Sequence, residues 1–168
     1  MTIEGKRTYR HELILYSAAA LSLLAALIHL WVIPEHFEEW WGYGSFFLIA
    51  ALAQGFYGAA LIRWPRKPLL LLGIGGNLLI IVLYLVTRTV GVPIFGPHAR
   101  EVEGVGVVDL CATVSELGIV LALGVFLLQD LSRQRRNLIL LILVIAILSL
   151  GHLLHLLLRA SPIHSSGS

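Results

Sequence analysis

The sequence predicts an all-α fold, a polytopic membrane bundle of five transmembrane helices with the N-terminus inside and the C-terminus outside. Only 13% of the 168 residues are charged, whereas about a quarter are charged in a typical soluble domain. The mean hydropathy is +0.87. Five apolar runs reach the roughly 20 residues that a helix needs to cross the hydrocarbon core. Helices are expected because unpaired backbone groups are too costly in lipid.

The first run covers residues 13–33 and follows three basic residues, Lys6, Arg7 and Arg10, as a signal peptide would. The run is too long for the apolar region of a signal peptide, and no convincing small-residue cleavage site follows it. We therefore expect a retained first helix. Pro34 is predicted to end it, because proline lacks the backbone N–H that a helix needs.

The second and third runs cover residues 43–63 and 68–90. A tight charged turn, 63–68, separates them. Glycine and proline residues between positions 91 and 97 end the third run and begin a longer loop. Within the second run, Gly55 and Gly58 are expected to permit the close approach of a neighbouring helix.

The fourth and fifth runs cover residues 105–129 and 137–158, with a polar break between them. We expect residues 1–160 to form a single five-helix transmembrane domain. Residues 161–168 are rich in serine and are expected to form a flexible tail. No internal repeat is evident, and the odd number of runs argues against the inverted duplication found in many transporters.

The distribution of Lys and Arg predicts the orientation. Nine lie on the side of the N-terminus and three on the opposite side. The nine are Lys6, Arg7, Arg10, Arg63, Arg66, Lys67, Arg133, Arg135 and Arg136, and the three are Arg88, Arg100 and Arg159. By the positive-inside rule the N-terminus is cytoplasmic, in a multi-pass protein of the plasma (inner) membrane. Trp40 and Trp41 then belong to an outer aromatic belt and Trp64 to an inner one.

Five ionisable side chains fall inside the apolar runs, where charge is costly and often marks function. They are His29, Asp109, Glu116, His152 and His155. At about 1.5 Å of rise per residue, all five are expected in the outer half of the bundle. Asp109 and Glu116 share one helix face, and so do His152 and His155, because their spacings match the helical repeat. Inward-turned faces of this kind would form an outward-opening polar pocket.

The residue types in this pocket predict a site for a metal ion or small cation. Imidazole and carboxylate ligands suit a divalent metal such as Zn, Fe, Mn or Cu. All five side chains, His29, Asp109, Glu116, His152 and His155, are candidate metal ligands. The HxxH spacing is less specific than HExxH, and the alternative is a hydrogen-bonded polar core that fixes helix register. Haem held between His29 and His155 is a less favoured alternative.

Several function classes stay open for such a pocket. A metal-dependent membrane hydrolase would use Glu116 or Asp109 as the catalytic base for a metal-bound water, but no nucleophile motif supports an enzyme. The other classes are a non-catalytic subunit or assembly partner of a larger membrane complex, and a transport or proton-relay protein. The expected partners are the lipid bilayer and either a second copy or a complex subunit, with no nucleic acid.

Two further residues have specific expected roles. Arg88 is expected to pair with Asp109 or Glu116, because an unpaired buried carboxylate would otherwise take up a proton. Cys111 is the single cysteine, so it excludes an internal disulfide and paired-thiol redox chemistry. It is expected to point away from the face of Asp109 and Glu116 and to act as a small apolar packing residue.

Two stretches of the sequence carry a resemblance. His29-Leu-Trp-Val-Ile-Pro-Glu-His-Phe-Glu-Glu-Trp-Trp and Thr87-Arg-Thr-Val-Gly-Val-Pro-Ile-Phe-Gly-Pro-His are similar to an uncharacterised family of small bacterial multi-span integral membrane proteins. The resemblance covers roughly residues 29–128. It implies a membrane location and no particular activity.

Overall fold

The structure, a computed structural model, describes residues 3–91 and 96–129, and farther on residues 134, 135, 137, 139–141 and 144. The chain divides into two compact units, Met1–Leu127 and Leu128–Ser168. The first unit is built from four long helices, and the last two residues of the fourth helix belong to the second unit. They are α1 (Ile3–Glu39), α2 (Trp41–Arg63), α3 (Lys67–Thr89) and α4 (Val107–Gln129). In the second unit, the described residues are helical.

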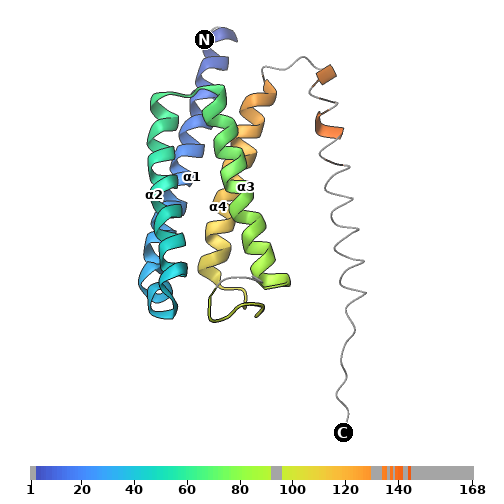
Figure 1. Ribbon diagram of the computed structural model, residues 1–168. Coiled ribbons are helices and arrows are strands. Elements are labelled where there is room, and N and C mark those ends of the chain that lie inside the picture. The colour runs from blue at the N-terminus through green and yellow to red at the C-terminus, as the bar shows by residue number, and fades with distance from the viewer. Residues whose placement is uncertain are drawn as a thin grey trace. The chain divides into compact units, whose positions relative to one another are not determined.

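The four helices lie side by side and alternate in direction (Figure 1). One end of the bundle, the turn end, carries the α2–α3 turn at residues 64–66 and the start of α1. The opposite end, the loop end, carries the connection between α3 and α4. Each of the four helices is long and apolar enough to cross a membrane. These findings confirm an all-helical membrane architecture for the described residues, whereas most of the fifth run, 137–158, lies outside them.

The prediction that Pro34 ends the first helix is wrong. α1 continues through Pro34 to Glu39. A proline inside a membrane helix is tolerated where neighbouring groups satisfy the freed backbone, and here it removes only one hydrogen bond close to the helix end. Two residues later, His36 Nδ1 donates to the carbonyl oxygen of Val32 at 2.8 Å, which adds a side-chain bond to this last part of the helix.

Small residues bring α1 and α2 together, and α1 packs more closely against α2 than against the other helices. A Cβ atom on Gly58 would lie 3.2 Å from the backbone oxygen of Ala19, and one on Gly55 would lie 3.9 Å from Cβ of Ala26. Backbones can approach this closely only where side chains are small. The expected role of Gly55 and Gly58 in close helix packing is therefore confirmed.

A cluster of fully buried apolar side chains fills the bundle toward the turn end. Its members are Ala18, Ala19, Leu61, Leu70, Ile119 and Leu123, and none is more than 2% exposed. Leu61 and Leu70 lie within one or two turns of the α2–α3 turn, which places the cluster at that end. We call this set the apolar plug. The buried polar residues lie on the loop-end side of it.

Candidate functional site

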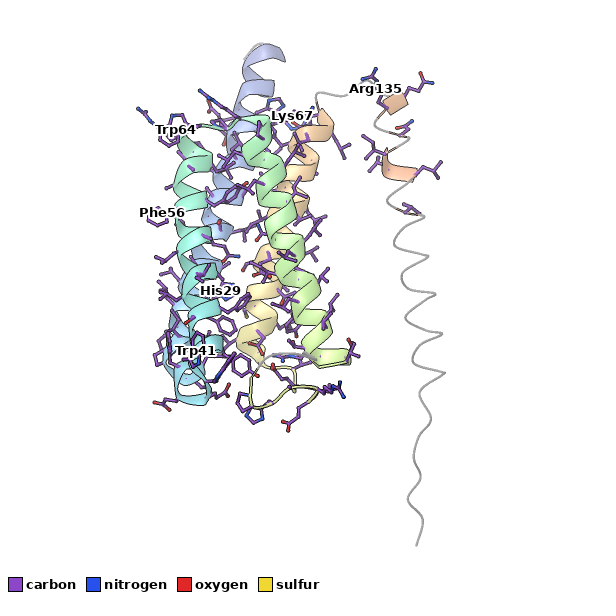
Figure 2. All side chains as sticks on the ribbon, in the orientation of Figure 1. His29, Trp41, Phe56, Trp64, Lys67 and Arg135 are labelled. Carbon is purple, nitrogen blue, oxygen red and sulfur yellow. The ribbon has the colours of Figure 1, made fainter. Side chains whose placement is uncertain are left out.

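Buried polar side chains from all four helices meet inside the bundle. They share an exposed fraction of 5% or less, and they are Ser22 and His29 from α1, Gln54 from α2, Asn77 from α3 and Glu116 from α4. We call this set the polar core. Figure 2 shows His29 between the labelled Trp64 and Trp41, on the side nearer Trp41 and therefore toward the loop end. His29 thus lies toward the loop end, whereas Gln54 and Glu116 lie near the middle of α2 and α4.

The centre of the polar core is a contact between His29 and Glu116. His29 Nε2 lies 3.1 Å from Glu116 Oε1, and the side chains are 5% and 1% exposed. A hydrogen bond across this distance needs one proton, held either on Nε2 or on the carboxyl group. Among the described residues, no Lys or Arg contacts Glu116. Glu116 therefore has no permanently charged partner in the described part of the chain.

Amide side chains extend the contact across the bundle. Gln54 Nε2 donates to Glu116 Oε1 at 3.3 Å and to Asn77 Oδ1 at 3.4 Å. Asn77 Nδ2 in turn donates to the carbonyl oxygen of Gly73 at 2.7 Å. On the other side, Ser22 Oγ donates to the backbone oxygen of Gln54 at 2.7 Å. Gln54 is thus held on three sides, and its Oε1 is buried without a hydrogen-bond partner in the described part of the chain.

Asp109 has a different partner from Glu116, although both were predicted to line one pocket. Arg88 Nη2 donates to Asp109 Oδ2 at 2.6 Å, and Arg88 Nη1 donates to Glu103. The guanidinium carbon also lies 5.1 Å from the centre of the Tyr84 ring. The expected pairing of Arg88 is confirmed with Asp109. We call Arg88, Glu103 and Asp109 the end clamp, because it closes the loop end of the bundle.

The end clamp joins the α3–α4 loop to the helices. The backbone N–H of Glu103 donates to the carbonyl oxygen of Thr87 at 3.1 Å, next to the contact of its side chain with Arg88. The side chains of Arg88, Asp109 and Glu103 are 12%, 28% and 48% exposed. The clamp is therefore much closer to water than the polar core.

Aromatic rings cover the polar core toward the loop end. The Phe47 ring centre lies 5.5 Å from that of His29 and 4.1 Å from that of His36. His29, Phe47 and His36 therefore form a column of rings that runs from the polar core toward the end of α1.

Only part of the predicted metal site can be located. His29 and Glu116 meet, whereas Asp109 is paired with Arg88. His152 and His155 lie outside the described residues. Among the residues that are described, no three His, Cys, Asp or Glu side chains form a group that could hold a metal ion. The located part of the site therefore brings together two of the five candidate ligands, His29 and Glu116.

Some contacts of the site were not anticipated from the sequence. Gln54 and Asn77 were recognised as polar residues on inward faces, but their bonds to Glu116 and to each other depend on how the helices are rotated. The buried hydroxyl of Tyr57 lies against Gly73, where a Cβ atom would be 1.9 Å away, and no sequence pattern indicated this. Cys111 is exposed, whereas Glu116 is buried, so the two side chains do point in different directions. The exposure of Cys111 does not fit the packing role that was expected for it.

Comparison with protein-family models, with curated proteins and with solved structures finds no match for this chain. The resemblance of residues 29–128 to small bacterial membrane proteins stays a prediction. Inference about function therefore rests on the geometry of the polar core.

Proposed function

We propose that this membrane protein binds a divalent metal cation, with Zn²⁺ as the best fit, inside its helix bundle. His29 and Glu116 supply two of the ligands. His152 and His155 stay candidate ligands from the sequence alone, because they lie outside the described residues. The observation that supports this proposal is the 3.1 Å separation of His29 Nε2 and Glu116 Oε1 in a site with no fixed positive charge beside it.

The separation suits two ligands of one ion. Metal bonds from His nitrogen and carboxylate oxygen are about 2.0–2.2 Å long. At tetrahedral or octahedral angles, neighbouring ligand atoms are then roughly 3.0–3.4 Å apart. The distance between His29 and Glu116 falls within this range. A modest shift of each side chain would admit the ion in place of the shared proton, and binding would release that proton.

Gln54 supports the same proposal from outside the ligand set. Its Nε2 bond to Glu116 Oε1 holds the carboxylate in one orientation, as partners of metal ligands commonly do. Its unpaired, buried Oε1 is a neutral oxygen that a cation or its bound water could use. In a purely structural polar core, a buried amide oxygen would usually have a hydrogen-bond partner.

The proposed topology has five spans, the turn end in the cytoplasm and the C-terminus outside. Its support is the ratio of nine to three in Lys and Arg between the two predicted sides. In this orientation the polar core lies toward the outer face, and the apolar plug lies between it and the cytoplasm. Transport through the bundle is less well supported than binding from outside, because Leu61, Leu70 and Ile119 fill the described bundle toward the turn end. The buried polar atoms that lie on that side, Tyr57 Oη and His11 Nε2, have no hydrogen-bond partner among the described residues.

A hydrolase role would rest on Glu116 alone. Asp109, the other candidate base, is already engaged by Arg88 Nη2 at 2.6 Å. We therefore place plain cation binding ahead of catalysis.

Elemental analysis of the purified full-length protein tests the proposal. The protein in detergent is loaded with Zn²⁺, dialysed against metal-free buffer and assayed for bound metal. About one equivalent should remain in the wild type, and it should be lost in His29→Ala, in Glu116→Gln and in the double variant His152→Ala with His155→Ala.

His98→Ala is the matched control. His98 is exposed and pairs with Glu101 at 2.9 Å in the loop, where it could bind Zn²⁺ adventitiously. The control should keep the wild-type metal content. A wild-type protein that is monodisperse and helical but retains no metal would contradict the proposal. Metal retained by every variant except His98→Ala would assign the binding to the surface.

A further inference from the structure

A cavity lies at the turn end, away from the polar core. It has a volume of about 640 Å³ and is lined by Ala60, Trp64, Arg66, Pro68, Leu69 and Leu72. Figure 2 shows Trp64 and Lys67 at this end, opposite Trp41. The lining combines apolar side chains on the helices with an aromatic and a basic side chain on the turn. That combination matches the boundary between acyl chains and headgroups in a bilayer.

The charged side chains at this cavity are all basic. Arg66 lines it, Arg63 and Lys67 flank it, and all three are exposed. In the described part of the chain, none of the three forms an ion pair with an acidic side chain. Compact anions are therefore attracted to this end of the bundle, since nothing nearby neutralises the basic groups.

The turn that carries these residues has a defined shape. The Trp64 N–H donates to the carbonyl oxygen of Ala60 at 2.8 Å, and the Arg66 N–H donates to that of Trp64 at 2.6 Å. α3 begins directly afterwards at Lys67, with Pro68 in its first turn. Because the connection is so short, the cavity walls on α2 and α3 are fixed relative to each other.

We propose that this cavity binds one anionic diacyl phospholipid of the membrane leaflet at the turn end. Its phosphate lies against Arg66 and Lys67, and the first carbons of an acyl chain lie along Leu69 and Leu72. The 66% exposure of Leu72 opens the cavity sideways to the hydrocarbon region, so a chain can enter it without crossing the protein. Trp64, 59% exposed, borders the headgroup level. This site is independent of the proposed metal site.

Native mass spectrometry of the full-length protein tests the proposal. Phosphatidylglycerol and phosphatidylcholine with identical acyl chains are titrated into the detergent solution, and retained lipid is counted. Each basic group near an anionic lipid contributes about a fivefold gain in binding. Arg66→Gln combined with Lys67→Gln should therefore weaken phosphatidylglycerol binding about 25-fold. Phosphatidylcholine should bind weakly to both proteins.

Two further variants make the result specific. Arg100→Gln removes a basic group from the α3–α4 connection at the loop end and should change phosphatidylglycerol binding by less than about twofold, because Arg100 does not line the cavity. Ala60→Leu keeps every charge but fills the cavity, and it should also lose the lipid. All variants are checked for monodispersity by size exclusion.

Four outcomes would overturn the proposal. The first is equal retention of the two lipids by the wild type. The second is an equal loss in the charge control. The third is unchanged binding in Ala60→Leu. The fourth is full competition by inorganic phosphate at equal concentration, which would assign the site to a free anion. If the wild type instead forms a dimer without bound lipid, and Ala60→Leu abolishes that dimer, the cavity is the contact site for a second copy of the chain.

Discussion

Asp109 and Glu116 lie on the same face of α4, about 10 Å apart along the helix, yet they are in opposite situations. Asp109 is 28% exposed and bonded to Arg88, a permanent cation. Glu116 is 1% exposed and bonded to His29, which is a cation only when protonated. The two carboxylates therefore differ in whether their counter-charge can leave.

This difference separates a structural ion pair, at Asp109, from the proposed binding site at Glu116. Arg88 neutralises the charge of Asp109, and the same guanidinium contacts Glu103, so the end clamp holds the α3–α4 loop against the bundle. Glu116 accepts from Gln54 and contacts His29, and no Lys or Arg pairs with it in the described part of the chain. The variants below are designed to break or sharpen this contrast, in order of decreasing expected effect.

Glu116→Ala should destabilise the protein most. It removes the partner of His29 and one of the two acceptors of Gln54 Nε2, and it leaves a cavity. We expect a loss of about 2–4 kcal/mol in the free energy of unfolding, measured by circular dichroism in mixed detergent micelles. Asp109→Ala is the matched control on the same helix face, and its loss should stay below about 1 kcal/mol. Equal losses would remove the distinction between the two carboxylates.

Arg88→Gln should have the next largest effect, and it should be local. Asp109 and Glu103 would lose their shared cation, at a cost of about 1–2 kcal/mol because both are partly solvated. Amide hydrogen exchange in residues 96–106 should speed up, whereas the amides around Gln54 should keep their protection. Faster exchange throughout the bundle would show that the clamp supports the whole fold.

Glu116→Gln should change stability by less than about 1 kcal/mol, because the amide keeps the shape of the side chain and an oxygen that can accept from Gln54 or His29. The shift in melting temperature that Zn²⁺ causes in the wild type should disappear in this variant. A persisting shift with unchanged stability would make Glu116 a bystander.

Salt should produce the smallest effect. Raising NaCl from 0.05 to 1 M screens partly exposed charges, so the stability difference between wild type and Arg88→Gln should shrink by about 0.5 kcal/mol. The difference between wild type and Glu116→Ala should not change, since its origin is buried. A strong salt dependence of the second difference would place water at the polar core.

The fold was largely readable from the sequence because apolar runs and helix breakers carry a strong signal. The runs 43–63 and 68–90 differ by no more than two residues at either end from α2 and α3. α1 differs more, since it extends from Ile3 to Glu39 instead of covering 13–33. Hydropathy marks where a helix leaves the membrane, and a helix can continue in water beyond that point.

The site was less readable, because spacing along one helix says which residues share a face but not what that face meets. The shared face of Asp109 and Glu116 was predicted correctly, and so was the bond of Arg88 to Asp109. The separate partners of the two carboxylates depend on helix crossing and rotation, which the sequence does not encode locally. The roles proposed for His152 and His155 stay predictions, as does the fifth span.

The long sequence separation between His29 and Glu116 has a consequence for biosynthesis. The two residues are 87 positions apart, whereas Ser22 reaches its partner Gln54 after 32. At about 5–20 residues per second, the ribosome needs roughly 4–17 s to make Glu116 after His29. During this interval the α1–α2 hairpin, joined at Trp40 alone, holds a histidine without its carboxylate. An unpaired imidazole can stay neutral in the membrane, which costs less free energy than an unpaired carboxylate charge. The order of synthesis makes the carboxylate the later of the two partners.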